Sequence, residues 1–251
     1  MKKILSILLC MVLVFALAAC GAKPVENSPS ENTSPKQADT NSVAESDTKE
    51  NNNQNNTSTE AASDLSSAEQ KMLVVYFSVP ETTSADNMTD EEDYSTYVRN
   101  GEVLGNVQYV AYLIQENTGA DIFRIEPTTA YPMNHAELEA VATQEKRDGA
   151  FPEIAAQIEN FDQYDTVFVG FPNWYADMPR ILYSLFENYN FSGKTIVPFV
   201  VSGGSGFSGS IGTITELEPD ATVIRDGYSI TRTRIEDAES GVADWLNGLG
   251  Y

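Results

Sequence analysis

Three segments rich in glycine, serine or aromatic residues are the parts of this 251-residue chain best suited to hold a ligand. They are Gly105-Asn106-Val107, Pro172-Asn173-Trp174-Tyr175 and Ser202-Gly203-Gly204-Ser205-Gly206-Phe207, and Ser78 follows an apolar run. Gly105 precedes a helical pattern, and a helix N-terminus favours an anion because its backbone N–H groups are free. Glycines let the backbone approach a ligand closely, whereas Trp and Tyr offer flat apolar cover. These segments therefore predict a binding site.

Nucleophilic and metal chemistry find little support in the sequence. The two cysteines, Cys10 and Cys20, both lie in the first twenty residues, and His135 is the only histidine. One histidine without cysteine partners cannot build a zinc site. The glycine-rich segment also lacks the Gly-x-Ser-x-Gly elbow of a serine hydrolase. We therefore expect no metal and no catalytic acid, base or nucleophile, and we expect His135 to face solvent or to begin a helix.

Short apolar runs alternate with helical patterns after about residue 70. The predicted strands are Met72–Phe77, Asp121–Glu126, Asp165–Gly170, Thr195–Val201 and Ala221–Arg225. Three of them are nearly continuously apolar, which is typical of parallel strands covered on both faces. Pro198 has no N–H to donate, so we expect a bulge or a local loss of pairing in the fourth strand.

The helical patterns complete the fold class. One spans Val110, Leu113 and Ile114 and stops at Gly119, a second runs from Met178 to Tyr189, and a third from Ile235 to Leu249. Strands that alternate with helices predict an α/β fold with a doubly wound, five-stranded parallel sheet. In such sheets ligands bind at the carboxyl ends of the strands, where the three segments lie.

The order and spacing of several short motifs extend over about 180 residues, from Met72 to Tyr251. The motifs are Val74-Val75-Tyr76-Phe77-Ser78, Gly105-Asn106, Ile125-Glu126-Pro127, Tyr131-Pro132, Tyr164-Asp165, the Pro172 loop, Phe191-Ser192-Gly193-Lys194-Thr195 and the Ser202 loop. Together they resemble the flavodoxin family, in particular members with a Tyr-Pro-x-Trp-Trp loop and a Ser-Gly-Gly-Ser-Gly-Phe loop. The resemblance implies a three-layer sandwich that binds flavin mononucleotide (FMN) without a covalent bond and passes electrons through it.

The resemblance also implies a role for each segment. Ser78 and Gly105-Asn106-Val107 would hold the phosphate, residues 172–175 would cover or edge the isoalloxazine ring, and residues 202–207 would approach its far side. This chain departs from the family at the phosphate loop, where Leu104 and Val107 occupy the places of two threonines. The hydroxyl groups that could replace them in the preceding insertion are those of Thr82, Thr83, Ser84, Ser95 and Thr96.

The insertion, residues 79–104, is strongly acidic. It contains Glu81, Asp86, Asp90, Glu91, Glu92, Asp93 and Glu102 against a single Arg99. Its carboxylates suggest a cation loop, but their spacing fits no calcium signature. A solvated flap is the favoured interpretation.

Composition limits the partners of the protein and its compartment. The chain has 37 acidic and 15 basic residues and a net charge of −22, which argues against nucleic acid as a partner.

Residues 1–20 fit a signal peptide, and Leu17-Ala18-Ala19-Cys20 resembles the lipobox of bacterial lipoproteins, which implies lipidation of Cys20. Residues 21–70 are polar and contain no aromatic side chain, as expected for a disordered linker, and residues 71–251 are expected to form the folded domain.

The sequence therefore predicts an exported lipoprotein on the bacterial cell membrane whose extracytoplasmic domain binds FMN. It would act as an electron carrier or as an FMN-dependent NAD(P)H or quinone oxidoreductase. Its partner would be a redox protein or a small acceptor such as a quinone. The alternative is a flavodoxin fold that has lost FMN and serves as a binding or interaction module in the cell envelope.

Overall fold

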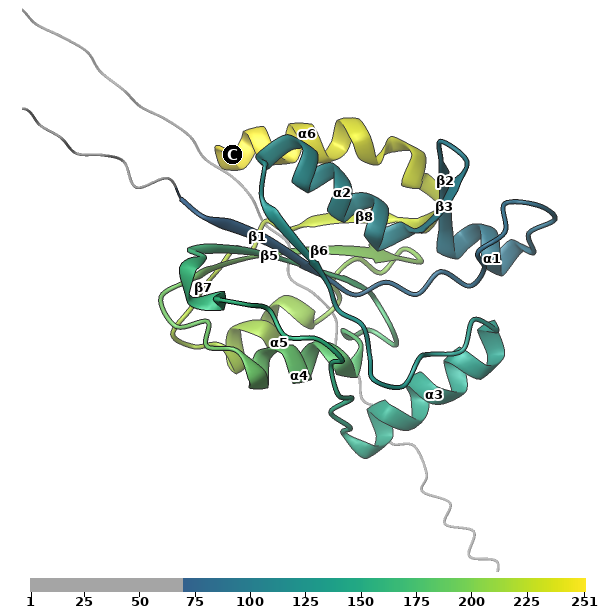
Figure 1. Cartoon of the computed structure of the whole chain (residues 1–251), viewed down its shortest axis with the longest axis horizontal. Helices are drawn as coiled ribbons and strands as arrows, with labels where there is room; N and C mark the ends of the chain where they lie inside the picture. The colour runs from purple at the N-terminus through teal and green to yellow at the C-terminus, as the bar shows by residue number, and fades with distance from the viewer. Residues whose placement is uncertain (1–69) are drawn as a thin grey trace, which may run out of the picture. The chain divides into compact units, whose positions relative to one another are not determined.

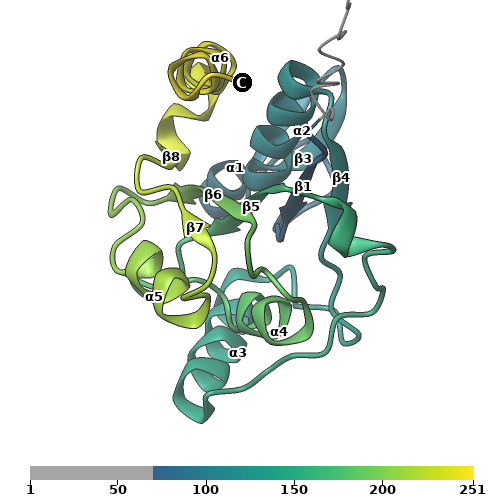
Figure 2. The same cartoon turned by 90° about the vertical axis from the view of Figure 1, so that its left-hand side faces the viewer.

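The computed structural model describes residues 70–251, which form a parallel sheet covered by helices on both faces (Figures 1 and 2). The strand order is β4-β1-β5-β6-β7, and β8 also pairs with β6. The strands are β1 (Met72–Tyr76), β4 (Asp121–Arg124), β5 (Thr166–Pro172), β6 (Thr195–Ser202), β7 (Thr222–Val223) and β8 (Tyr228–Thr231). The predicted doubly wound α/β fold, with five strand positions, is confirmed.

Alternation along the central strands explains why their sequences are apolar without interruption. In β1, Val74 and Tyr76 belong to the core on one face of the sheet, whereas Leu73 and Val75 belong to the core on the other. Successive side chains of a strand point to opposite faces, so a sheet covered twice needs apolar residues at every position. Helices α2 (Asn106–Thr118) and α6 (Ala238–Leu249) cover the first face, and α4 (Arg180–Asn188) and α5 (Ser210–Leu217) cover the second (Figure 1).

The predicted helices form close to their expected positions. Helix α2 ends at Gly119, whose φ of 69° is the left-handed conformation that a glycine C-cap adopts readily. Helix α4 follows Pro179, and α6 follows the short 3-10 helix η2 (Arg232–Asp237). Helix α3 (His135–Asp148) packs beside α4 and is capped by the preceding residue, Asn134, whose side chain accepts a hydrogen bond from the N–H of Glu137.

The fifth strand position is divided in two, and Pro198 explains the division. Strand β7 pairs with Thr195 and Ile196, whereas β8 pairs with residues 199–202, so Val197 and Pro198 have no strand partner on that side among residues 70–251. The carbonyl oxygen of Pro198 faces Gly227, in the break between β7 and β8. A residue's N–H and C=O point to the same side of a strand, so the missing donor of Pro198 falls at this break. The expected loss of pairing is confirmed on one side of β6, and Pro198 keeps its place opposite Val169 of β5 on the other.

The acidic insertion is folded. It contains helix α1 (Asp90–Ser95) and a hairpin of β2 (Thr96–Arg99) and β3 (Glu102–Gly105). Asn100 and Gly101 form the two-residue turn with φ values of 54° and 84°. The ring of Tyr97 stacks on that of Tyr109 of α2, with centroids 4.0 Å apart. The four acidic residues at the start of α1 remain at the surface, as in a solvated flap, but the segment is packed against the domain.

The predicted signal peptide with Cys20, and all of the predicted linker except Gln70, lie outside the described residues. Within residues 70–251, no helix is both long and apolar enough to cross a membrane.

Candidate functional site

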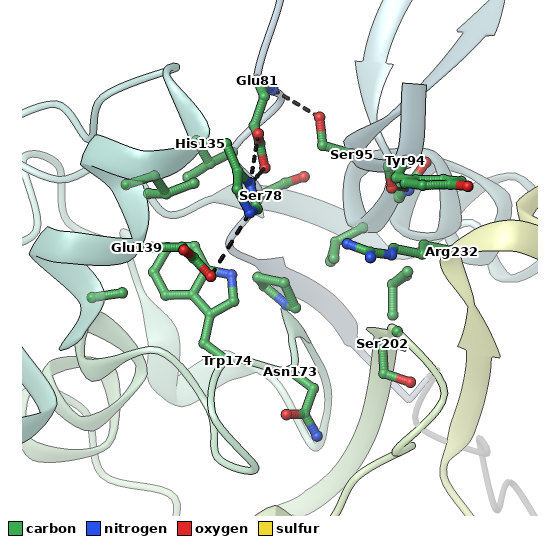
Figure 3. A pocket seen from close by; sticks show the side chains of 18 of the residues that line it. Ser78, Glu81, Tyr94, Ser95, His135, Glu139, Asn173, Trp174, Ser202 and Arg232 are labelled. Atoms are coloured by element: carbon green, nitrogen blue, oxygen red, sulfur yellow. Dashed lines mark hydrogen bonds and ion pairs between the residues drawn. The ribbon is translucent and has the colours of Figure 1, made fainter. Parts of the chain in front are cut away.

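A cavity of about 230 Å³ opens at the carboxyl ends of β1, β5 and β6 (Figure 3). Nine of the candidate residues line it, as the arrangement of parallel strands predicts: Ser78, Asn106, Val107, Pro172, Asn173, Trp174, Tyr175, Ser202 and Gly203. The other candidates, Gly105, Gly204, Ser205, Gly206 and Phe207, do not line it. Loops that are up to 125 residues apart in sequence therefore meet at one site because the sheet brings their strands side by side.

One end of the cavity is formed by the N-terminus of α2. Gly105 is the residue before the helix, and a side chain at this position would overlap the hydroxyl of Ser78. The first N–H groups of a helix have no partner within it, so this end of the cavity is electropositive. Gly105 therefore acts by leaving room for Ser78, although it does not face the cavity itself.

Asn106 is the first residue of α2 and is only 4% exposed. Its Nδ2 donates a hydrogen bond to the backbone oxygen of Tyr94 at 2.7 Å, which fixes the orientation of the amide. Its Oδ1 is buried and finds no hydrogen-bond partner within residues 70–251. A buried acceptor without a donor is unfavourable by about 1–3 kcal/mol, so this atom marks a place where a ligand would be stabilised.

Only one of the five hydroxyl groups suggested for the interrupted phosphate loop reaches the cavity. Ser95 lines it, but its Oγ accepts from the N–H of Glu81 at 2.9 Å and donates to the oxygen of Glu92 at 3.0 Å. Thr96 is buried and donates to the oxygen of Glu92 at 2.7 Å, and Thr82, Thr83 and Ser84 do not line the cavity. The insertion therefore does not restore the two missing threonines.

The opposite wall of the cavity is aromatic. Trp174 meets Phe77 and Tyr131 edge-to-face, with ring centroids 5.6 Å away in both cases. Trp174 and Asp177 exchange two backbone hydrogen bonds around a tight turn in which Tyr175 and Ala176 have φ values of 53° and 62°. The hydroxyl of Tyr175 donates to the backbone oxygen of Glu139 of α3 at 3.2 Å. The wall is thus held in place by packing and by hydrogen bonds to α3.

The glycine-rich loop after β6 is shaped by two side chains. The Oγ of Ser202 accepts hydrogen bonds from the N–H groups of Gly204 and Gly206, at 3.2 and 3.0 Å. Gly204 has a φ of 127°, which L side chains rarely adopt, and Phe207 packs against Phe171 in the core. Residues 204–207 therefore form the loop but do not touch the cavity, and only Ser202 and Gly203 present the loop to a ligand.

Sequence reasoning missed an acidic and histidine cluster on the α3 side of the cavity (Figure 3). The Nδ1 of His135 lies 2.9 Å from a carboxylate oxygen of Glu81, and its Nε2 lies 3.7 Å from Glu139. The hydrogen bond to Glu81 raises the pKa of His135, and burial opposes this rise. His135 does begin a helix, as expected, but it also lines the cavity. No sequence signal pairs it with Glu81, which lies 54 residues away.

Sequence reasoning also missed Arg232. It follows β8, a strand that was not predicted, and its side chain enters the cavity on the side opposite to His135 (Figure 3). Within residues 70–251, the structure contains no group of three or more His, Cys, Asp or Glu side chains placed to hold a metal ion.

Comparison with known proteins gives the family. The flavodoxin family model matches residues 96–249, and a search of curated proteins finds no match. Among solved structures, a protein assigned as a flavoprotein from Bacteroides eggerthii is 25% identical over 72% of this chain and 98% of its own, with a TM-score of 0.55. A second, from Bacteroides uniformis, is 23% identical over 71% and 98% of the two chains, with a TM-score of 0.52. Since the family model covers more than half of the sequence, the chain belongs to the flavodoxin family.

Proposed function

We propose that this protein binds FMN non-covalently and transfers electrons through it. The observation that carries the proposal is one cavity with two different ends. The N-terminus of α2, Ser78 and the unpartnered Oδ1 of Asn106 form a polar end, and Trp174 belongs to an aromatic wall. A phosphorylated flavin has an anionic phosphate, a chain of hydroxyl groups and a flat ring. The phosphate and the hydroxyl groups match the polar end, and the ring matches the aromatic wall.

Each residue then has a binding or positioning role. The α2 N–H groups and the Ser78 hydroxyl would donate to the phosphate, and Asn106 Oδ1 would accept from a hydroxyl of the ribityl chain. Trp174 would pack on the ring, and Gly203 would allow the backbone after β6 to approach it. When bound, FMN supplies the electron-accepting ring, whereas the protein orients it, limits its contact with water and tunes its potential.

An electron carrier is favoured over an enzyme that oxidises a nicotinamide. The one Gly-x-Gly-x-x-Gly match in the sequence, residues 204–209, belongs to the loop after β6 that already forms part of the proposed flavin site, so it does not mark a second, dinucleotide site. Helix α1, which has four acidic residues in its first turn, lies beside the carboxyl end of the sheet (Figure 1), where its negative charge would attract a basic partner protein. A redox partner protein or a small acceptor such as a quinone would take the electrons.

The direct test is a titration of the purified protein with FMN, followed by quenching of flavin fluorescence, with riboflavin in parallel. Stoichiometric binding of FMN that is much tighter than binding of riboflavin supports the proposal. A folded protein that binds neither flavin would contradict it and favour an interaction module. Anaerobic mixing of the oxidised, FMN-loaded protein with NADH distinguishes a carrier from a reductase, because only a reductase should be reduced rapidly. Chemically reduced protein, mixed anaerobically with a soluble quinone, then tests whether it passes electrons to a small acceptor.

We also propose that Cys20 is lipidated and anchors the domain to the outer face of a bacterial membrane. The support is the small-residue motif before Cys20, after an uncharged run of 16 residues. Two acyl chains suffice for stable anchoring, whereas one does not. Expression of a Cys20→Ser variant tests this: the wild-type protein should sediment with membranes and label with radioactive palmitate, and the variant should do neither.

A further inference from the structure

We propose that Arg232 binds the phosphate of the flavin and supplies the donors that the interrupted phosphate loop has lost. This inference rests on the proposed function, because it names the residue that distinguishes FMN from riboflavin. Arg232 lies 125 residues beyond Val107, the site of one missing threonine, and the arrangement of the sheet alone brings the two together.

The position of Arg232 follows from strand register. Thr231, the last residue of β8, pairs with Ser202, the last residue of β6. Arg232 therefore comes directly after the carboxyl edge of the sheet, beside Gly203. A Cβ atom at Gly203 would lie 3.8 Å from the Nε of Arg232, so the guanidinium passes close to the loop that lines the cavity.

Tyr94 connects Arg232 to the start of α2. The guanidinium carbon of Arg232 lies 4.9 Å from the centre of the Tyr94 ring, a cation–π contact. The backbone oxygen of Tyr94 accepts the hydrogen bond from Asn106 described above. Figure 3 shows Tyr94, Arg232 and Ser202 on one side of the cavity and His135, Glu139 and Trp174 on the other. Arg232, the N-terminus of α2 and the Oδ1 of Asn106 thus share one side of the cavity.

The charges around the cavity leave Arg232 as the group available to an anion. Two basic side chains occur among the described residues that line it, and His135 is already beside Glu81 and Glu139. Arg232 forms no ion pair with any residue of the range 70–251, whereas Arg234 in the same 3-10 helix pairs with Asp237 at 2.8 Å. In a chain with a net charge of −22, an anionic ligand needs such a local cation.

A guanidinium is a better substitute for two hydroxyl groups than an ammonium would be. Its planar arrangement of N–H donors binds two oxygens of a phosphate at once, and these charge-assisted bonds are stronger than those from neutral hydroxyls. The Asn106 Oδ1 requires a donor and therefore faces a hydroxyl of the ligand rather than a fully ionised phosphate oxygen. The two residues together recognise a phosphate attached to a polyol chain.

The test compares Arg232→Gln with Arg234→Gln in the full chain, by titration with FMN and with riboflavin. Arg232→Gln should weaken FMN binding by about 10- to 100-fold and leave riboflavin binding unchanged, because only the phosphate contact is lost. Arg234→Gln should bind both flavins like the wild type. Arg232→Lys should be intermediate, and the salt dependence of FMN binding should be weaker in Arg232→Gln than in the wild type.

The outcomes separate this inference from the proposed function. If the wild-type protein binds FMN and the Arg232→Gln variant binds it with equal affinity, the proposed role of Arg232 is overturned and the proposed function stands. Equal losses of FMN and riboflavin in that variant would mean a structural role and would also overturn it, and circular dichroism of the flavin-free variant would reveal the altered fold. Wild-type protein that binds neither flavin overturns both proposals.

Discussion

The Nδ2 of Asn173 donates a hydrogen bond to the backbone oxygen of Gly206 at 2.6 Å, and so joins the loop after β5 to the loop after β6. The same amide lies 3.1 Å from the Oγ of Ser208. Ser202 holds the second loop from the other side through the N–H of Gly206. The loop that carries the aromatic wall and the glycine-rich loop after β6 are therefore coupled through one residue, Gly206, that does not itself line the cavity.

We expect Asn173→Ala to loosen both loops and to weaken binding of FMN and of riboflavin alike. The lost hydrogen bond is worth about 0.5–1.5 kcal/mol, or about 2- to 12-fold in affinity. Parallel fluorescence titrations measure the effect, and Arg232→Gln provides the contrast because its loss should be confined to FMN. A loss confined to FMN in Asn173→Ala would contradict a role at the ring end.

Gly105→Ala should reduce FMN affinity by roughly tenfold or more, because the new methyl group requires the Ser78 hydroxyl to move. The backbone itself tolerates alanine, since the φ of Gly105 is −67°. The matched control is Gly212→Ala within α5, where a Cβ atom would meet open space. That control should keep full FMN affinity and gain about 0.5–1 kcal/mol in unfolding free energy. Equal FMN affinity in both variants would refute the steric argument.

Ala176 has a φ of 62°, a left-handed conformation that an alanine adopts at a cost of about 1–2 kcal/mol. Ala176→Gly relieves this cost and adds the entropic penalty of glycine, so we expect a net gain in stability of about 0.5–1 kcal/mol. Ala140→Gly, at an exposed position inside α3, should instead lose about 1 kcal/mol. Urea unfolding of both variants measures whether the unfolding free energy rises in Ala176→Gly and falls in Ala140→Gly. If both variants lose a similar amount of unfolding free energy, the turn is not strained.

The ion pair of His135 with Glu81 should make stability depend on pH. The hydrogen bond to Glu81 raises the pKa of His135 above its ordinary value of 6.5. The folded state then binds the proton more tightly than the unfolded state, so the stabilisation is complete below pH 6.5 and is lost as the pH rises through the raised pKa. The unfolding free energy of the wild type should therefore fall across this range.

Glu81→Gln removes most of that dependence, because the neutral amide does not favour a charged imidazole. Between about pH 5.5 and pH 8.5, the unfolding free energy of this variant should change less with pH than that of the wild type. Glu137→Gln, an exposed change in the first turn of the same helix, is the control and should leave the profile of the wild type intact. If the unfolding free energy of Glu81→Gln depends on pH in the same way as that of the wild type, the ion pair of His135 with Glu81 is not the source of the effect.

Most of the sheet could be predicted from the sequence because burial on two faces leaves a simple pattern. Strands β1, β5 and β6 are long apolar runs, and the C-cap of α2 is marked by Gly119. Strand β8 was missed because Tyr228–Thr231 is only four residues long and alternates buried with exposed positions. The fold of the insertion was missed as well, since its many carboxylates concealed the Asn100-Gly101 turn between β2 and β3.

The candidate site was predictable where it depends on loops after recognised strands. Ser202 ends β6, Ser78 and Trp174 lie two residues after the ends of β1 and β5, and all three line the cavity. Arg232 was not predictable, because its position depends on the missed β8 and on its register with Ser202. The pairing of His135 with Glu81 depends on the path of the insertion, which no local pattern determines.

The break in the fifth strand position also bears on how copies of this protein behave when crowded together. A long, straight outer strand offers unpaired N–H and C=O groups on which another chain can add, and this is a common start of aggregation. Here one border of the sheet is β4, four residues with a charge at each end, and the other is the pair β7 and β8, interrupted opposite Pro198. Neither border offers a continuous template, so self-association by strand addition is disfavoured at high local concentration.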